Sequence, residues 1–448
     1  MSIDWLFRRL ESFGDAEAIV QGDQSYSYRT LVGAIEREEA FLDAHGVAPG
    51  EVVMLEGDFA PRSIALLLCL AHRNAVIAPL APGAIVEASA LIESCEASVV
   101  LTAGPGEEMR LSRTGRRSEH ALIQTLRERQ SPGLIIFTSG STGKSKVVVH
   151  DFGRVIEKFE KPKTTARTLS FLLFDHIGGI NTLIQTLTSG GALIIPADHD
   201  PETVAAAVER SKVELLPVSP TFLNLLLMSG AHERHDLRSL KIVSYGTEPM
   251  PETTLRRATE SLPWARFHQL YGLSEMGILR SKVRDPRSLW VQLGGEGVET
   301  RIVDGLLEIR SRSAMLGYLN APSPFTPDGW LMTGDEVEQD GEWIRIKGRR
   351  SEMINVGGQK VFPAEVESVI AALDNIKDVT VFGEPHPMMG QVVACRVNLV
   401  APEEPRALRA RIRKHCSEHL TAFKVPVRVE VTEEAQYSSR HKRLRPKA

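Results

Sequence analysis

The sequence predicts an α/β protein in which helices pack in layers on a mostly parallel sheet. Three segments near the N-terminus carry this prediction, because strand and helix patterns alternate along them. Residues 25–55 are typical of a strand, a helix, a turn and a second strand. Residues 61–71 then predict another helix, and residues 76–80 another strand.

The first of these helices is predicted to be amphipathic. Its apolar side chains recur near helical spacing and should face the core: Leu31, Ala34, Ile35 and Leu42. The four consecutive charged residues 36–39 should face water. Gly46 and Pro49-Gly50 are expected to end the helix before the next strand.

Length and charge limit the class of protein. With 448 residues, of which 42% are hydrophobic, the chain can bury a large core and should form more than one domain. The net charge of −4 argues against a protein that binds nucleic acid. Residues 107–130 are rich in arginine, but the interspersed acids favour a solvated loop and helix over a patch that binds polyanions.

Cysteine spacing and hydropathy predict a soluble cytoplasmic protein. Residues 1–10 lack the continuous apolar core of a signal peptide. Residues 64–70, the most apolar early stretch, are too few to span a bilayer. The cysteines form no CxxC pair and no metal-ligand spacing, which is expected of reduced thiols: Cys69, Cys95, Cys395 and Cys416.

Residues 134–150, LIIFTSGSTGKSKVVVH, are the most informative stretch. Apolar runs at 134–137 and 147–149 predict two strands. The loop between them is rich in hydroxyls, glycine and lysine: Thr138, Ser139, Gly140, Ser141, Thr142, Gly143, Lys144, Ser145 and Lys146. Glycine lets backbone N–H groups approach an anion, and ammonium groups neutralise its charge. The loop is therefore predicted to bind a polyphosphate.

Two other interpretations of this loop are disfavoured. A Walker loop would need glycine where Thr138 stands, and it opens a helix rather than a strand. A plain surface turn would seldom interrupt so apolar a run. The loop closely resembles the signature loop of the adenylate-forming superfamily, which includes acyl- and aryl-CoA ligases, peptide-synthetase adenylation domains and luciferases. The resemblance implies that this loop binds the phosphates of ATP.

Residues 267–277, FHQLYGLSEMG, resemble the YGxTE motif of the same superfamily, with Ser274 in place of threonine. Phosphates would repel a carboxylate beside them unless a cation lay between, so Glu275 is predicted to bind Mg²⁺. The resemblance adds Thr138 as a second metal ligand. It also implies that Tyr271 offers a flat face to adenine and that Gly272 belongs to the nucleotide site.

Two further segments resemble the family's nucleoside-binding motifs. Residues 240–250, LKIVSYGTEPM, predict a strand followed by an adenine-contacting segment: Gly246, Thr247 and Glu248. Residues 329–335, GWLMTGD, end in Asp335, which the resemblance assigns to both ribose hydroxyls. A carboxylate suits that role because it presents acceptors only. Arg349 matches the second ribose contact.

Residues 169–196 are expected to place the acid substrate. A strand should end at Phe174, and a helix should run from the glycines 178–179 through Leu187. By resemblance, His176 matches the histidine beside the acyl pocket of CoA ligases. The alternative is that Asp175 matches the aspartate with which peptide synthetases bind the α-amine of their substrate. Counting back from Gly190 instead aligns His176 with the CoA-ligase histidine, which favours a substrate without an α-amino group. The predicted pocket contains His176, Ile177, Gly246, Gly272 and Ile278.

The resemblance divides the chain into an adenylation domain, residues 1–350, with a small β-barrel-like piece, and a mobile lid domain, residues 351–448. The hinge position falls on Ser351. Gly357 and Gly358 match the glycines that line the pantetheine tunnel, and Pro363 should open a helix. Lys442 matches the lysine that reaches the α-phosphate, although His441 replaces the usual glycine. A solvated basic tail and a nucleic-acid tail are the alternatives.

The family implies a two-step reaction: an acid attacks ATP to give an acyl-adenylate and pyrophosphate, and a thiol then forms a thioester. Lys442, Thr138, Thr142, Ser274 and Mg²⁺ should stabilise the first transition state. CoA is the predicted acceptor. A carrier-protein pantetheine or an amine is the rival, and a degenerate nucleotide-binding module is the alternative outside enzymes. The sequence sets neither the acid nor the oligomeric state.

Overall fold

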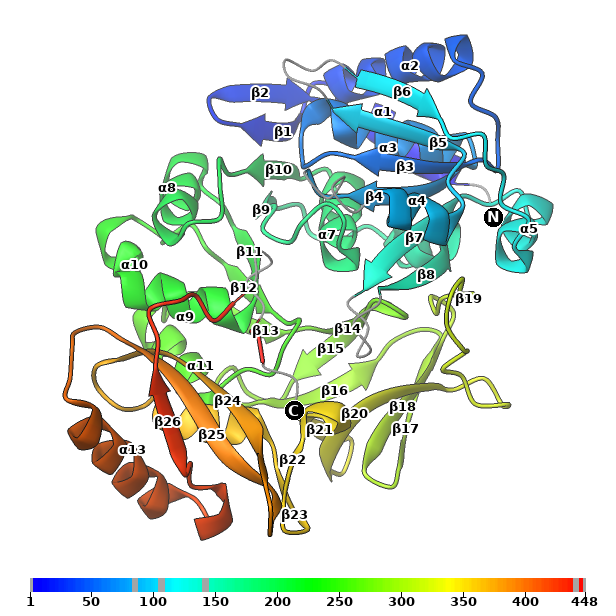
Figure 1. Ribbon diagram of the computed structural model, residues 1–448. Helices are drawn as coiled ribbons and strands as arrows, with labels where there is room; N and C mark the ends of the chain where they lie inside the picture. The colour runs from blue at the N-terminus through cyan, green and yellow to red at the C-terminus, as the bar shows by residue number, and fades with distance from the viewer. Residues whose placement is uncertain (1–2, 83–87, 104–108, 139–144, 438–442, 446–448) are drawn as a thin grey trace. The chain divides into compact units, whose positions relative to one another are not determined.

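The structure, a computed structural model, describes residues 3–82, 88–103, 109–138, 145–437 and 443–445. The chain forms two compact units (Figure 1). The first unit contains Met1–Pro217, Gly272–Leu279 and Arg310–Phe325, and the second contains Val218–Tyr271, Arg280–Ile309 and Thr326–Ala448. Both units mix helices and strands, which confirms the predicted α/β class.

The first unit is organised around sheets and the helices that connect their strands. Its helices are α1 (Asp4–Ser12), α2 (Tyr28–Ala44), α3 (Pro61–His72), α4 (Ala88–Cys95), α5 (Ala121–Glu128), α6 (Phe152–Ile156), the 3₁₀ turn η3 (Glu157–Phe159), α7 (Ile177–Thr188) and α8 (Pro201–Ser211). Its strands are β1 (Glu17–Gln21), β2 (Gln24–Ser27), β3 (Val52–Glu56), β4 (Val76–Leu80), β5 (Val99–Ala103), β6 (Met109–Arg113), β7 (Gly133–Thr138), β8 (Lys146–Asp151), β9 (Arg167–Leu169), β10 (Ala192–Ile195) and β19 (Gly317–Tyr318). The chain passes between the units within or next to β11 (Leu215–Val218), β14 (Tyr271–Leu273), β15 (Gly277–Val283) and β18 (Leu306–Ser311).

The largest sheet of the first unit has the strand order β19-β8-β7-β4-β3-β5-β6. Its centre is parallel, because β3 pairs with β4 and β5, and β4 pairs with β7. Strands β8 and β6 run antiparallel to their neighbours. All five residues of β3 are buried, as is typical of a parallel strand covered on both faces. The predicted mostly parallel arrangement is confirmed for this unit.

Helices α2 and α3 confirm the predicted helices, with one correction. Glu38, expected to face water, is only 7% exposed. Its carboxylate accepts a hydrogen bond from Nε of Arg62 at 2.8 Å. Because α3 packs against α2, this charged position falls in the helix–helix contact, where the arginine compensates the buried carboxylate.

Two other expectations need correction: the end of one strand, and a segment expected to be loop and helix that also contains a strand. Strand β9 ends at Leu169 and not at Phe174. The chain turns before α7, and a Cβ added at Gly179 would lie 2.1 Å from the carbonyl oxygen of Leu173. Residues 107–130 contain the strand β6 as well as helix α5. An edge strand tolerates the arginines of β6 because only one of its sides is paired.

Within the described ranges, the second unit contains five helices, and most of its strand pairs are antiparallel, with two parallel pairs at 242–245 with 266–269 and at 394–397 with 428–431. Its helices are α9 (Pro220–Ser229), α10 (Ala231–Arg234), α11 (Glu252–Ser261), α12 (Pro363–Ile370) and α13 (Pro405–His419), with the 3₁₀ turns η4 (Arg350–Glu352) and η5 (Ala422–Lys424). Its strands are β12 (Ile242–Tyr245), β13 (Arg266–Gln269), β16 (Trp290–Gly294), β17 (Val298–Val303), β20 (Leu331–Asp340), β21 (Trp343–Arg349), β22 (Ile354–Val356), β23 (Gln359–Val361), β24 (Ile376–His386), β25 (Gly390–Leu399) and β26 (Arg428–Val431). The predicted barrel-like piece is an antiparallel sheet in which β16-β21-β20-β18-β17 are neighbours.

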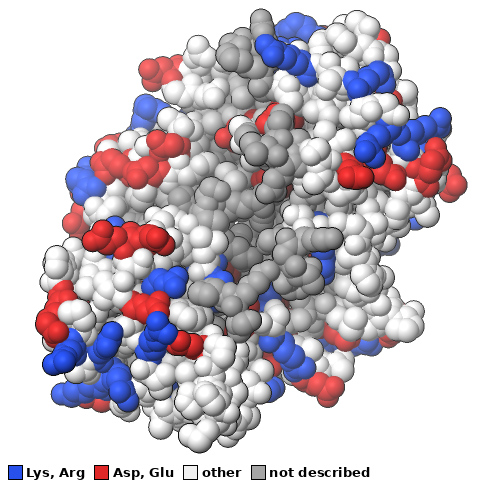
Figure 2. Space-filling model, viewed as in Figure 1, with Lys and Arg blue, Asp and Glu red and all other residues white. Residues whose placement is uncertain are grey.

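The C-terminal part of the second unit is built on the long, twisted β24–β25 pair, with α13 alongside (Figure 1). Helix α13 buries one apolar stripe, Leu408, Ile412 and Cys416. Its outer face is basic, and Lys and Arg gather over it in Figure 2. Of the helices within the described ranges, none has the length and apolar character that crossing a membrane requires.

Candidate active site

The predicted phosphate loop connects two antiparallel strands of the first unit. Strands β7 and β8 pair from Gly133 opposite Asp151 to Thr138 opposite Lys146, and Thr138 is half-buried. A strand therefore follows the loop, as predicted, and not the helix that a Walker loop requires. The predicted loop residues between them lie outside the described residues: Ser139, Gly140, Ser141, Thr142, Gly143 and Lys144.

Glu275 lies between β14 and β15, and neighbouring segments of the same unit hold it. The hydroxyl of Tyr318 donates to Oε1 of Glu275 at 2.6 Å. The backbone N–H of Met315 donates to the carbonyl oxygen of Glu275 at 2.8 Å. The carboxylate and the backbone of Glu275 are thus both fixed.

The preceding residue, Ser274, is held by a buried histidine. Nε2 of His150 lies 2.6 Å from the carbonyl oxygen of Ser274, which can only accept, so Nε2 carries the proton. Burial lowers the pKa of His150. The imidazole is therefore neutral in the folded protein and acts here as a hydrogen-bond donor.

The predicted acid-pocket residues of the first unit occupy two places. His176 caps α7, because its Nδ1 accepts a hydrogen bond from the N–H of Gly178 at 3.1 Å, and Ile177 begins the helix. Ile278 lies over Gly272, where an added Cβ would be 2.5 Å from Cδ1 of Ile278. The remaining pocket residue, Gly246, belongs to the second unit.

Three predicted nucleoside-binding residues meet in the second unit. Asp335 of β20 is paired in register with Arg349 of β21, and Nε of Arg349 lies 3.5 Å from its Oδ1. The hydroxyl of Tyr271 donates to Oδ2 of Asp335 at 2.6 Å. Burial raises the pKa of Tyr271 well above its usual value, and the charge of Asp335 adds to this effect. The phenol therefore stays protonated and remains a donor.

The segment after β12 contains a strained turn and a hydrogen-bonded carboxylate. Thr247 adopts a φ of +75°, a backbone conformation that residues other than glycine rarely take. Glu248 accepts a hydrogen bond from the N–H of Thr221 at 2.8 Å, in the first turn of α9. A carboxylate is favourable there because helix N-termini carry partial positive charge. Strand β12 ends at Tyr245, so the segment that begins at Gly246 follows a strand, as predicted.

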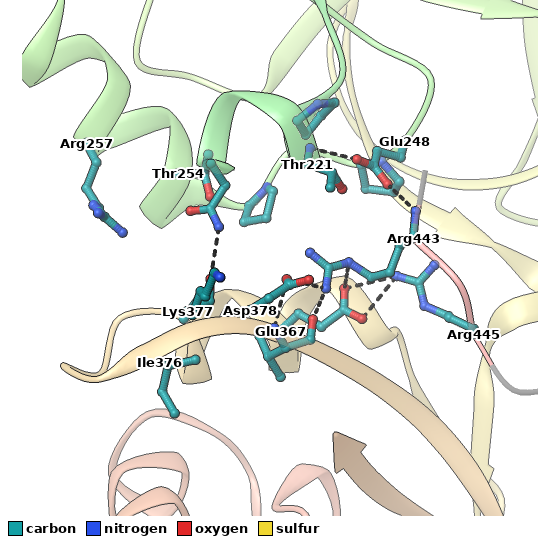
Figure 3. Close-up of a pocket in the computed structure, with 16 residues that line it drawn as sticks. Thr221, Glu248, Thr254, Arg257, Glu367, Ile376, Lys377, Asp378, Arg443 and Arg445 are labelled. Atoms are coloured by element: carbon teal, nitrogen blue, oxygen red, sulfur yellow. Dashed lines mark hydrogen bonds and ion pairs between the residues drawn. The ribbon is translucent and has the colours of Figure 1, made fainter. Parts of the chain in front are cut away.

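A small pocket of the second unit is lined by buried charges (Figure 3). Nη1 of Arg443 donates to Oδ1 of Asp378 at 2.9 Å, and its Nε lies 3.8 Å from Oε2 of Glu367. The backbone N–H of Arg443 donates to Oε2 of Glu248 at 3.3 Å. Nη2 of Arg445 donates to Glu367 at 2.9 Å. Both arginines are thus bound to acidic side chains.

The predicted hinge and tunnel residues lie on the surface of the second unit. Ser351 is exposed within η4, and Gly357 and Gly358 form the turn between β22 and β23 with φ of +57° and +88°. Pro363 opens α12, as predicted. Lys442 lies outside the described residues, but Tyr437 and Arg443 on either side of its segment form an antiparallel bridge.

Several side chains that hold these groups carry no motif that assigns them a role. Tyr318 and Asn320 belong to residues 313–320, SAMLGYLN, and His150 closes the stretch that contains the phosphate loop. Only their place inside or between the motifs indicates a role in the site, because the residues that they contact are distant in sequence. The sequence likewise gives no signal for a role of Arg443 in holding Glu248, Glu367 and Asp378.

Comparison with known proteins identifies the family. The AMP-binding enzyme family matches residues 6–319, and the AMP-binding enzyme C-terminal domain matches residues 365–442. Indoleacetate–CoA ligase of Aromatoleum aromaticum is 26% identical over 95% of this chain and 93% of its own length. Feruloyl-CoA synthase of an Amycolatopsis species is 25% identical over 96% of this chain and 94% of its own.

A solved structure shows the same fold. The anthranilate CoA ligase AuaEII, in complex with anthranoyl-AMP, has a TM-score of 0.83 and 20% identity, covering 98% of this chain and 95% of its own. These matches confirm the predicted superfamily, the predicted fold and the prediction of an AMP-forming ligase. Since the family match spans more than half of the sequence, this chain belongs to the AMP-binding enzyme family.

Proposed function

We propose that this enzyme activates a carboxylic acid with ATP as an acyl-adenylate and transfers the acyl group to the thiol of CoA. The observation that carries the proposal is the contact of two buried residues, Tyr271 and Asp335, with Arg349, whose side chain is half exposed. A carboxylate presents acceptors only, on two oxygens, so the group held by Tyr271 is of the type that accepts hydrogen bonds from ribose hydroxyls. Gly246, Thr247 and Glu248 would contact adenine in the same unit.

The phosphates of ATP would lie on the loop from Thr138 to Lys144. Glu275 and Thr138 supply oxygen ligands, the type that Mg²⁺ prefers, and Glu275 is already held in place by Tyr318 and Met315. The donor set therefore fits this ion. When bound there, Mg²⁺ would neutralise phosphate charge and keep the carboxylate from repelling the nucleotide.

In the first step, a carboxylate oxygen of the acid attacks the α-phosphorus of ATP, and pyrophosphate leaves. Negative charge grows on the non-bridging oxygens, where Lys442, Thr142 and Ser274 would stabilise it. The positions of the neighbouring cations support the choice of Lys442. Arg443 and Arg445 are bound by Asp378, Glu367 and Glu352, so their charges are already compensated.

In the second step, residues 351–448 would rotate about Ser351 relative to residues 1–350. Gly357 and Gly358 would then line the path of the pantetheine arm to the acyl-adenylate. The thiol sulfur attacks the acyl carbonyl, and AMP leaves with the carboxylate oxygen that joined the two. We place the enzyme in the cytoplasm, which its four free and buried cysteines support.

The acid would enter beside His176, Ile177, Gly246, Gly272 and Ile278. The relatives described above carry the names of indoleacetate, ferulate and anthranilate ligases, which supports an aromatic acid as substrate. Transfer to a carrier-protein pantetheine or to an amine is the second candidate. The site of the adenylation step would be the same in that case, and only the group that accepts the acyl chain would differ.

The proposal is tested by measuring AMP and pyrophosphate release with aryl, short-chain and long-chain acids. Each acid is assayed with CoA, with a pantetheinylated carrier protein and with simple amines. The proposal expects AMP release that depends on both an aryl acid and CoA. Release only with the carrier protein or an amine would move the function to the second candidate. Absence of any acyl-adenylate over the whole panel would identify a degenerate nucleotide-binding module.

A further inference from the structure

Residues 313–320, termed here the β19 segment, add a strand to the phosphate-loop strand β8. Gly317 pairs with Val149, and Tyr318 pairs with Val148. Backbone N–H groups of Leu316 and Leu319 donate to the carbonyl oxygens of Val149 and Val147 at 2.7 and 2.9 Å. The backbone of this segment is therefore locked to the strand by which the chain leaves the phosphate loop.

Asn320 ties the end of the β19 segment to the end of the loop itself. Its Oδ1 accepts a hydrogen bond from the N–H of Val147 at 2.9 Å, and its Nδ2 donates to the carbonyl oxygen of Ser145 at 2.9 Å. The side-chain amide thus binds both a donor and an acceptor of the main chain. These two contacts fix the backbone where the loop rejoins β8.

Tyr318 connects the same segment to Glu275. Tyr318 is 7% exposed, and Nζ of Lys146 lies 4.9 Å from the centroid of its ring. Its hydroxyl donates to Oε1 of Glu275 at 2.6 Å, the short distance expected of a hydrogen bond to a charged acceptor. A neighbouring cation over the ring makes the phenol a better donor. Tyr318 therefore lies between the loop exit and the carboxylate.

We propose that Tyr318 and Asn320 are positioning residues that hold Glu275 and the phosphate-loop exit in one fixed geometry. Tyr318 holds the Glu275 carboxylate that would bind the divalent cation, and Asn320 holds the backbone of Ser145 and Val147, where the chain leaves the loop that would bind the phosphates. This inference rests on the proposed function, in which Glu275 is the metal ligand. The two residues can be distinguished by their effects on binding. Tyr318 affects the affinity for the metal, and Asn320 affects the affinity for the nucleotide with or without metal.

The test measures binding without turnover. Mn²⁺ replaces Mg²⁺, and its affinity for the protein with a non-hydrolysable ATP analogue is read by electron paramagnetic resonance. Analogue affinity without metal is measured by calorimetry. Tyr318→Phe should weaken Mn²⁺ binding about tenfold, as for loss of one hydrogen bond to a charged group, and leave metal-free analogue binding unchanged. Asn320→Ala should weaken analogue binding in both conditions.

Tyr28→Phe is the matched control. Tyr28 is a fully buried tyrosine of the same unit, and its hydroxyl donates to the carbonyl oxygens of Leu187 and Gly191. This variant should bind Mn²⁺ and the analogue as the native enzyme does, even if its melting temperature falls. A Tyr318→Phe protein with native Mn²⁺ affinity would overturn the inference.

Glu275→Gln separates the inference from the proposed function. If this variant loses Mn²⁺ affinity and Tyr318→Phe does not, the metal assignment stands and the positioning role is wrong. If Glu275→Gln itself binds Mn²⁺ normally, the metal assignment of the proposed function is wrong, and the inference falls with it. In a Glu275→Gln background, Tyr318→Phe should have no further effect on Mn²⁺ affinity.

Discussion

Arg443 and Asp378 form an ion pair that is largely shielded from water. The two groups lie 2.9 Å apart, and their side chains are 10% and 7% exposed. Burial raises the pKa of Asp378, whereas burial alone would lower the pKa of Arg443, which its acidic neighbours instead raise. The pair therefore persists because each charge compensates the other.

We predict that Arg443→Met lowers the free energy of unfolding by about 3–5 kcal/mol, because Asp378 and Glu367 lose their buried counter-charge. Urea denaturation at neutral pH measures the change. Arg428→Met is the control, because Arg428 pairs with Glu384 and Glu430 on the surface, where it is 56% exposed. That control should cost about 1 kcal/mol or less. Equal losses in both variants would contradict the buried-pair account.

The neutral state of His150 predicts a dependence of stability on pH. Its pKa in the folded protein is lowered from 6.5 by burial, so the unfolded chain takes up this proton first. The contribution of His150 to the free energy of unfolding is fully present above pH 6.5. It is lost as the pH falls toward the pKa of His150 in the folded protein, at up to about 1.4 kcal/mol per pH unit. His150→Gln keeps a donor for Ser274 but removes the titration.

The free energy of unfolding of both proteins is measured by urea denaturation between neutral pH and mildly acidic pH. The native enzyme should lose stability faster than His150→Gln as the pH falls. His45→Gln, at an exposed position, should follow the native profile. Parallel profiles for the native enzyme and His150→Gln would show that His150 does not titrate as a buried neutral group.

Lys442 is predicted to act in the first half-reaction only. Lys442→Ala should lower acid-dependent ATP–pyrophosphate exchange by about a hundredfold or more, because one charge-stabilising contact in the transition state is lost. The variant should still convert a synthetic acyl-adenylate to the thioester. Arg440→Ala, two residues earlier, should leave both half-reactions intact. The assignment fails if Arg440→Ala is the variant that loses exchange.

Asp335 is predicted to bind the ribose hydroxyls of ATP. Asp335→Asn should raise the KM for ATP about tenfold, since it replaces a charged acceptor with a neutral amide. With 2′-deoxy-ATP the difference between native and variant enzymes should shrink, because one of the two ribose contacts is already missing. Asp340→Asn, at the far end of β20, is the control. An unchanged KM for ATP in Asp335→Asn would remove this residue from the ribose site.

Local pattern predicted much of the fold. Helix α3, strand β4 and the helix opened by Pro363 follow the sequence signals closely, because apolar periodicity and proline act within a few residues. The motif order likewise predicted that Tyr271, Asp335 and Arg349 serve one site. Glu38 was placed wrongly, since the pattern of one helix does not reveal that α3 covers its charged side.

The residues that hold the site could not be predicted because their partners are distant in the chain. Tyr318 and Glu275 are 43 residues apart, and Arg443 and Asp378 are 65 apart. Only the folded topology brings such pairs together. The edge strand β6 was missed for a related reason: its pairing with β5, rather than its own arginine-rich composition, makes it a strand.

Isotope transfer shows whether the acid carboxylate bonds to the α-phosphorus of ATP. An aryl acid carrying heavy oxygen in its carboxylate is turned over with ATP and CoA, and the products are analysed by mass spectrometry. We expect AMP to gain one heavy oxygen atom per turnover and pyrophosphate to gain none, because the bridging oxygen leaves with AMP when the thiol attacks. AMP without the label, or label in phosphate released from the end of the nucleotide, would rule out the acyl-adenylate.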